Sequence, residues 1–295
     1  GVTGNGRTIG IYASGTAIKV IDSDFSGSPN QAVYLRGTDL TITGTDVSGS
    51  GTGVLVQNTE APVTIGVDND FTNTNIGIYL SAVSDLTLEG FTIPSRTYGI
   101  YGDGNLVQNL EIKDSVLSAN GGSGVYITNG RNILVDGVTA NGRNYGALLQ
   151  GSELEVKDST FRSSTDRAVH LRGNDLVVTG SDFSNSNRGI FLTTASAPIT
   201  IGDDNIFSGT TTGLYLSRVS DLTLEGLTLP STTYGVYSDG NLSQDLTFKS
   251  LDMRSTGGSG LYLENATGVE VDTGNGSGRA TGVYLNGSGN VIKDS

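Results

Sequence analysis

Hydrophobic and polar residues alternate in short runs that recur along the whole chain. Val33 and Leu35 form one alternating pair. Leu40 and Ile42 form a second pair, and Val47 follows alone. Runs with a period of two, separated by glycine and aspartate, are typical of short β-strands joined by tight turns. The pattern therefore predicts an all-β chain, with three short strands in each unit of 21–25 residues.

Each unit begins with a motif of glycine or alanine, an aliphatic residue, usually an aromatic residue, and then a second aliphatic residue, as in residues 282–285. The first position of this motif occurs thirteen times, at 10, 32, 53, 77, 99, 124, 146, 168, 189, 213, 235, 260 and 282. The spacings are 22, 21, 24, 22, 25 and 22, then the same six values again, and each set of six sums to 136. Residues 15–150 and 151–286 are therefore two tandem copies of a longer unit, flanked by partial units at 1–14 and 287–295.

A repeat of this length cannot bury its hydrophobic side alone, so the repeats are expected to stack as coils of one continuous solenoid domain over residues 1–295. Two columns of side chains should fill its interior. One holds Ile11, Val33, Val54, Ile78 and Ile100, and the other Phe25, Val47, Phe71, Ile93 and Leu117.

The Gly-Ile/Val-Tyr-Leu runs, and runs such as residues 39–44 and 175–180, resemble the right-handed parallel β-helix of the pectin-lyase-like superfamily. The resemblance covers the whole chain and implies that fold, with about 13 coils. It does not define an activity, because the superfamily includes lyases, hydrolases, epimerases, adhesins, tailspikes and spacers.

Charge and composition exclude several partners. The formal net charge is −13 and the isoelectric point is near 4.3, which disfavours binding to nucleic acid. No apolar run reaches membrane-spanning length, so no membrane insertion is expected in this segment. Cysteine is absent, so the chain has no disulfide framework.

The aromatic position of the motif lies between two inward aliphatic residues, so its side chain should point outward. Nine of the twelve tyrosines occupy this position. Stacking between coils, contact with another protein and saccharide binding each explain such a column. The candidate interface or glycan-binding residues are Tyr12, Tyr34, Tyr79, Tyr101, Tyr126, Phe191, Tyr215, Tyr237, Tyr262 and Tyr284.

Two acidic turns are candidates for calcium binding. Asp68 and Asp70 belong to one, and Asp203 and Asp204 to the other. Their carboxylates are the hard oxygen ligands that Ca²⁺ prefers, although aspartates also cap turns by binding their own backbone. No other cofactor is expected.

No catalytic residue is predicted. Polygalacturonase-like members of the superfamily carry Asn-Thr-Asp, Asp-Asp and Gly-His-Gly runs, and epimerase-like members carry Asp-Pro-His. Asp203-Asp204 is the only one of these runs in the sequence, so neither pattern is present. The sole histidine, His170, takes the place of Tyr34 in the second copy and extends the aromatic column.

We therefore expect a non-enzymatic structural or adhesive segment, a stalk or filament, of a large secreted or cell-surface repeat protein. Its partners would be further copies of itself, bound head-to-tail or laterally, other surface proteins, or a polysaccharide. The alternatives are a polysaccharide-active enzyme (lyase, hydrolase or epimerase) and a carbohydrate-binding module. Both ends fall inside a repeat, as expected of a piece of a longer array.

Overall fold

The computed structural model describes residues 1–60, 62–102, 104–254 and 257–293. Over these residues the secondary structure is β-strand and turn, with no helix. Two compact units are formed, the first by Gly1–Arg143 with Ala147–Leu149 and the second by Asn144–Gly146 with Gln150–Ser295. No helix in the described residues is long and apolar enough to cross a membrane.

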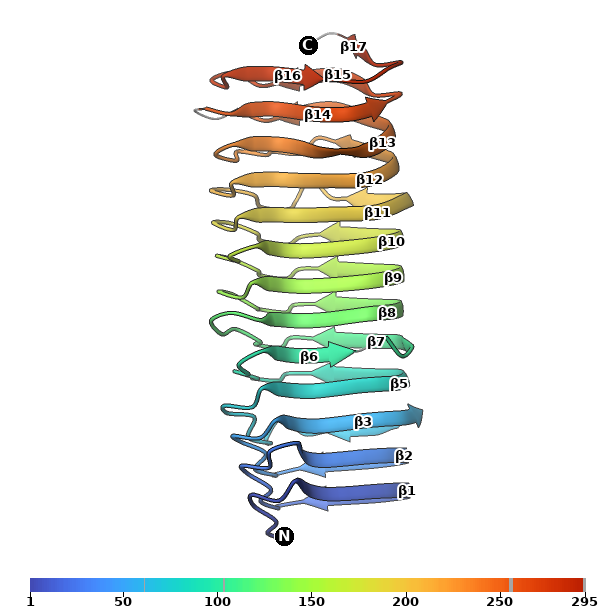
Figure 1. Cartoon of the computed structure of the whole chain (residues 1–295), viewed down its shortest axis with the longest axis vertical. Coiled ribbons are helices and arrows are strands. Elements are labelled where there is room, and N and C mark those ends of the chain that lie inside the picture. The colour runs from blue at the N-terminus through green and yellow to red at the C-terminus, as the bar shows by residue number, and fades with distance from the viewer. Residues whose placement is uncertain (61, 103, 255–256, 294–295) are drawn as a thin grey trace. The chain divides into compact units, whose positions relative to one another are not determined.

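The first unit is a stack of parallel strands, each paired with the strand one coil further along the chain (Figure 1). The coil spacing of the sequence motif reappears as this pairing, since Val33 lies opposite Val54 and Val54 opposite Ile78. The strands are β1 (Ile9–Ile21), β2 (Gln31–Thr43), β3 (Thr52–Glu60), β4 (Val63–Ile65), β5 (Ile76–Glu89), β6 (Tyr98–Gly102), β7 (Val107–Lys113) and β8 (Ser123–Asp136).

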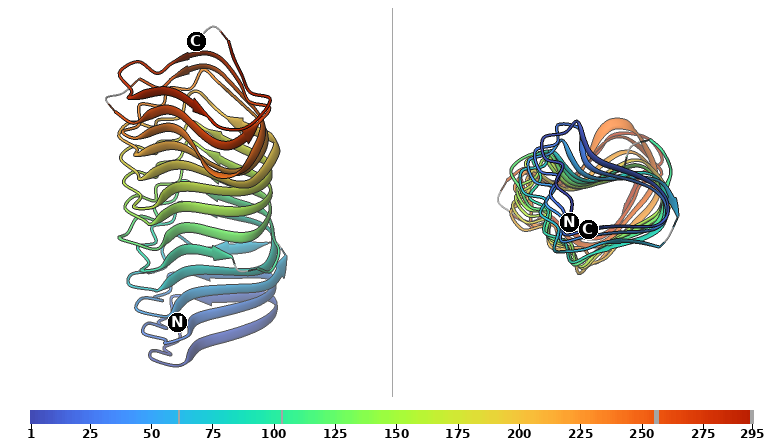
Figure 2. Two further views of the ribbon diagram at one scale, coloured as in Figure 1. Left: turned by 45° about the horizontal axis from the view of Figure 1, so that its top comes forward. Right: turned by 90° about the horizontal axis from the view of Figure 1, so that it is seen from below.

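The second unit repeats this construction, and Figure 2 shows its strands following one another coil upon coil. The strands here are β9 (Tyr145–Lys157), of which residues 147–149 belong to the first unit, β10 (Arg167–Thr179), β11 (Arg188–Ile201), β12 (Thr212–Glu225), β13 (Tyr234–Asp252), β14 (Ser259–Thr267), β15 (Glu270–Asn275), β16 (Thr281–Leu285) and β17 (Val291–Lys293).

The prediction of three separate strands in each coil is wrong in detail. The first two runs form one bent strand in most coils, as in β2, which holds both Leu35 and Leu40. The bend lies at Gly37 and Asp39, whose φ angles are 123° and 52°. These conformations turn the chain while its parallel pairing continues, because Gly37 stays in register with Gly15. The third run contributes only single bridges, such as that between Asp46 and Asp70.

The predicted interior columns are confirmed. From Val33 onward the first column is fully buried, as are Val47, Ile93 and Leu117 of the second. Phe25 and Phe71 are 1% and 2% exposed. Ile11 is only half-buried. Burying each such side chain contributes roughly 1.5–3 kcal/mol, so these columns hold the coils together.

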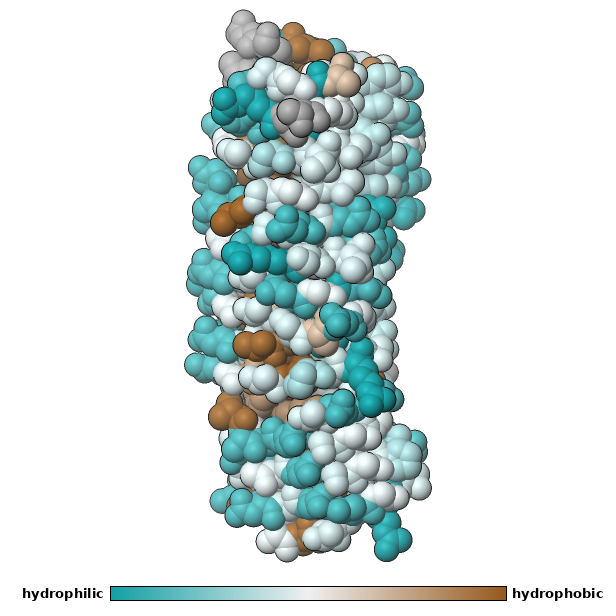
Figure 3. All heavy atoms as spheres, turned by 90° about the vertical axis from the view of Figure 1, so that its left-hand side faces the viewer, coloured by the Kyte–Doolittle hydropathy of each residue, from teal (hydrophilic) through white to brown (hydrophobic). Residues whose placement is uncertain are grey.

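One face of the molecule is largely polar. On the face drawn in Figure 3, hydrophilic and neutral side chains dominate and hydrophobic ones are scattered among them.

Aspartates in the turns accept hydrogen bonds from backbone amides two residues further along the chain. Asp46 Oδ1 accepts a hydrogen bond from the Ser48 amide at 2.8 Å, and Asp70 Oδ1 does the same with Thr72. Such turns need no ligand to be stable.

Candidate functional site

Tyrosine side chains gather on the outward side of the strands that open each coil, and we call this surface of each unit its aromatic face. In the first unit Tyr12 lies in register with Tyr34, and Tyr79 with Tyr101 and then Tyr126. Leu55 separates the two groups. Tyr12 is 53% exposed, whereas the other four tyrosines are half-buried.

The aromatic face of the second unit is longer. His170, Phe191, Tyr215, Tyr237 and Tyr262 lie in successive register, and Tyr284 follows Tyr262. Phe191 is 8% exposed and Tyr284 is 37% exposed. The structure thus places every residue of the predicted column on this side of the strands.

Neighbouring rings contact one another, and this decides which part of each ring meets solvent. Tyr262 and Tyr284 stack with centroids 4.5 Å apart and planes inclined by 11°. Tyr237 and Tyr262 stack at 5.6 Å and 10°. In the first unit Tyr101 and Tyr126 stack at 5.4 Å and 23°. A stacked ring gives its face to its neighbour and presents its edge and hydroxyl outward, so these rings are poorly disposed to stack on a sugar ring.

Three further tyrosines belong to the same faces. The ring centroids of Tyr98 and Tyr101 are 4.6 Å apart, and those of Tyr234 and Tyr237 are 4.8 Å apart. The Arg167 guanidinium lies over the ring of Tyr145 and over the ring of Phe191. All three come immediately before the first position of the motif. The strict alternation of a strand would place a side chain there on the opposite side from the aromatic face. Their recurrence just before Gly99, Gly146 and Gly235 was the available signal.

Two arginines lie among the rings of the second unit. The guanidinium carbon of Arg167 lies 4.1 Å from the ring centroid of Phe191, and that of Arg188 lies 5.0 Å from the ring centroid of Tyr215. Asp166 forms ion pairs with both arginines. The cationic groups are therefore already held by ring faces and a carboxylate.

His170 is fixed within this cluster. Its Nδ1 lies 3.1 Å from Arg167 Nη1 and its Nε2 lies 2.8 Å from Thr193 Oγ1. Burial, together with the charge of Arg167, lowers the pKa of His170 to about 3. The imidazole is therefore neutral at physiological pH, and Nδ1 accepts from the arginine.

Two hydroxyls of the second aromatic face are bound to carboxylates. Tyr262 donates a hydrogen bond of 2.6 Å to Glu264 Oε1, and this bond raises the pKa of Tyr262 to about 12. Burial is the main cause that raises the pKa of Tyr215 to about 12, with Asp239 adding to it. Both phenols thus stay protonated at neutral pH.

The aspartates predicted to bind calcium lie in separate units. Asp68 and Asp70 follow β4 in the first unit, and Asp203 and Asp204 follow β11 in the second. Within the described ranges, no three acidic, histidine or cysteine side chains lie close enough to hold a metal ion together. Calcium binding stays a prediction.

Two buried asparagines with structural roles adjoin these aspartates in the sequence, Asn69 between Asp68 and Asp70, and Asn205 directly after Asp204. The Asn69 side chain accepts from the Thr45 amide at 2.9 Å and donates to the carbonyls of Ile42 and Gly66. Asn205, 136 residues later, makes the corresponding bonds to Ser181, Val178 and Gly202.

A second pair at equivalent positions is Arg143, which is fully buried, and Arg279, which is half-buried. The Arg143 guanidinium donates to the carbonyls of Leu117, Ser95 and Gly121 at 2.7–3.2 Å. Arg279 makes two corresponding bonds in the second unit, to the carbonyls of Met253 and Gly257, but its other bonds go to Thr233 and Leu229 and not to Ser231. Desolvation lowers the pKa of Arg143 to about 10, so it keeps its charge at neutral pH.

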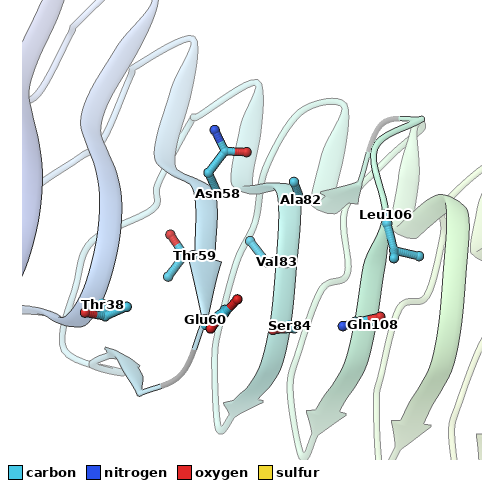
Figure 4. A pocket seen from close by; sticks show the side chains of 9 residues that line it. All are labelled: Thr38, Asn58, Thr59, Glu60, Ala82, Val83, Ser84, Leu106 and Gln108. Carbon is cyan, nitrogen blue, oxygen red and sulfur yellow. The ribbon is translucent and has the colours of Figure 1, made fainter.

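A groove of about 500 Å³ lies on the first unit, at the side where β3 and β5 bend (Figure 4). It combines apolar groups with amides and one carboxylate. Its lining residues are Thr38, Asn58, Thr59, Glu60, Ala82, Val83, Ser84, Leu106 and Gln108.

Stacked coils joined by parallel strands define the class of this protein, a parallel β-helix. The family model for the right-handed beta helix region matches residues 8–149 and 132–272, so the chain belongs to that family, which places it in the pectin-lyase-like superfamily. No curated protein sequence matches it.

Two solved structures are similar in outline. The A-module of mannuronan C-5 epimerase AlgE4 from Azotobacter vinelandii is 12% identical, with 95% of this chain and 91% of that chain covered and a TM-score of 0.42. The A-module of mannuronan C-5 epimerase AlgE6 from the same organism is 11% identical, with 96% and 91% covered and a TM-score of 0.41.

Proposed function

We propose that this chain is a non-enzymatic structural and adhesive segment of a secreted or cell-surface repeat protein. The proposal rests on inner contacts that recur at corresponding positions of the two 136-residue copies. The Asn69 and Asn205 side chains make the same set of hydrogen bonds in their turns. Arg143 and Arg279 share two carbonyl contacts, to Leu117 and Gly121 in the first copy and to Met253 and Gly257 in the second. A spacer needs only these inner contacts.

Outward positions, in contrast, differ between the copies. Glu60 corresponds to Ser196, and Thr128 to Glu264. An enzyme of this fold would need a unique set of reacting groups on one face, and such a set interrupts a repeat locally. Here the inner contacts repeat while single surface residues vary, which suits a scaffold that presents different surfaces.

Adhesion would use the aromatic faces. They combine stacked rings, which present edges and hydroxyls, with T-shaped pairs such as Tyr79 and Tyr101, and such a surface can pack against a protein and hydrogen-bond to it at the same time. The proposed partners are further copies of the chain or other surface proteins.

The test compares assembly with catalysis on the same purified protein. Sedimentation velocity over a range of concentrations should show self-association, and the double variant Tyr79→Thr/Tyr101→Thr should weaken it. The matched control, Thr41→Ser/Thr87→Ser, changes outward positions away from the aromatic face and should leave association unchanged. Incubation with polyuronates should give neither unsaturated nor epimerised products by ultraviolet absorbance and NMR. The appearance of either product would overturn the proposal.

The groove on the first unit favours carbohydrate binding as a second candidate. Its volume lies within the range typical of ligand sites, about 300–1,000 Å³. Asn58, Gln108 and Glu60 offer the amides and carboxylate that bind sugar hydroxyls, beside the apolar Val83 and Leu106. Binding on a glycan array that is lost in Glu60→Ala/Gln108→Ala would support it, and binding that survives this change would exclude the groove.

A further inference from the structure

Three parallel tyrosine rings in the second unit form a stack with a proton acceptor at its centre. Tyr262 lies between Tyr237 and Tyr284, and its plane is within about 11° of both. The Tyr262 hydroxyl donates to Glu264 Oε1 at 2.6 Å. One-electron oxidation of a phenol makes its hydroxyl strongly acidic, so a bound carboxylate that takes the proton makes the oxidation easier.

We propose that Tyr262 is a site of one-electron oxidation by peroxidase-type oxidants, and that its product is a covalent Tyr262–Tyr284 dityrosine bond between neighbouring coils. The inference is independent of the adhesive role.

Tyr262 and Tyr284 each lose one electron and one proton, and the proton of Tyr262 passes first to Glu264. The two radicals form one carbon–carbon bond between ring positions ortho to the hydroxyls, and both rings regain aromaticity by tautomerisation. Hydrogen peroxide accepts the two electrons and two protons through the peroxidase and becomes two molecules of water.

The other carboxylate-bound tyrosine lacks the geometry for coupling. Tyr215 interacts with Asp239, but its ring is inclined by 64° to Phe191 and by 53° to Tyr237. Phe191 has no hydroxyl from which a tyrosyl radical could form. Tyr262 alone among the hydroxyl–carboxylate pairs described above combines a proton acceptor with parallel tyrosine neighbours.

Access for the oxidant is provided at Tyr284, which is 37% exposed. Tyr262 itself is half-buried. Its contact with the exposed ring at 4.5 Å allows an electron to pass between them.

The first copy supplies a natural control. Tyr126 corresponds to Tyr262 and also stacks on its predecessor, Tyr101. However, Thr128 stands where the second copy has Glu264, and Leu148 stands where it has Tyr284. The fold is the same, but this position lacks both the carboxylate and the coupling partner.

The experiment treats the whole chain with horseradish peroxidase and hydrogen peroxide, then measures dityrosine fluorescence and maps cross-linked peptides by mass spectrometry. The expected product joins the peptides of Tyr262 and Tyr284, lighter by two hydrogen atoms than their sum. Tyr284→Phe should abolish this product, and Glu264→Gln should slow its formation. The double change Thr128→Glu/Leu148→Tyr should create a second cross-link in the first unit.

Circular dichroism spectra that match the parent protein show that each variant is folded. The proposal is overturned if the cross-link joins Tyr101 and Tyr126 as readily, or if Glu264→Gln reacts at the parental rate. It is also overturned if cross-linking occurs chiefly between molecules through Tyr12, which at 53% is the most exposed of the ring residues.

Discussion

Arg143 shows how a single charged residue can stabilise this fold from inside. The side chain is fully buried, yet its hydrogen bonds go to carbonyl oxygens and to the hydroxyl of Ser95. It follows the coil of 25 residues, the longest spacing in the repeat. The carbonyls of Leu117 and Gly121, in that longer coil, would lose their donor without it.

Arg143→Ala should therefore lower the free energy of unfolding by about 3 kcal/mol, because several buried acceptors lose their donor at once. Denaturant unfolding followed by circular dichroism measures the change. The control is Arg36→Ala, at an exposed position, which should shift stability by less than about 0.5 kcal/mol. Equal effects of the two changes would contradict the structural role.

His170 makes stability depend on pH. Its pKa is about 3 in the folded protein and near 6.5 when unfolded. The unfolded chain thus binds more protons between these values, so the contribution of His170 is full above pH 6.5 and is lost as the pH falls toward 3. His170→Tyr introduces the residue found at the equivalent position 34. Between pH 7 and 5 its free energy of unfolding should fall by less than that of the parent protein. Urea midpoints at both pH values measure this difference, and identical pH dependence would contradict the assignment.

At the scale of the element, the bend inside each long strand is the feature that lets one strand serve two sides of a coil. Gly37 and Gly173 occupy corresponding bends, with φ angles of 123° and 131°. A Cβ at Gly37 would overlap the carbonyl oxygen of Gly15, and one at Gly173 would overlap that of Gly151. Parallel pairing at close range thus requires glycine here.

Gly37→Ala should destabilise the first unit by about 1–3 kcal/mol or more, from backbone strain together with the overlap. Gly282→Ala is the control, because a Cβ there meets no atom within 4 Å and Ala32 already occupies the same motif position. Thermal unfolding distinguishes them. A stable Gly37→Ala protein would show that the bend can move.

At the scale of the whole molecule, negative charge is the dominant long-range term. The net charge of −13 repels itself in the compact state. Exposed ion pairs, such as Lys293 with Glu270, contribute little individually.

Added sodium chloride should consequently raise the melting temperature at pH 7, because a Debye length of about 10 Å at 0.1 M screens that repulsion. Differential scanning calorimetry over a salt series tests this. Near the isoelectric point of about 4.3 the salt dependence should vanish. A melting temperature at pH 7 that falls with salt would mean that attractive pairs dominate instead.

The solenoid, its coil spacing, its inward columns and its outward aromatic column could all be predicted from the sequence, because a period of two with a fixed repeat allows one stacking register. The sequence did not reveal that two predicted strands fuse into one, because the left-handed residues at the bend read as a turn. It also did not place Tyr98 and Tyr234 on the aromatic faces.

The contacts between side chains of neighbouring coils could not be predicted in this way, because they depend on how the folded coils pack. Arg143 reads as a surface arginine in a polar turn, yet its partners lie 22–48 residues away. The orientation of the tyrosine rings, and the bond from Tyr262 to Glu264, likewise depend on packing between coils. Local periodicity specifies on which side of a strand a residue lies, but the angle of a ring and the partner of a charge are set by atoms brought close through folding.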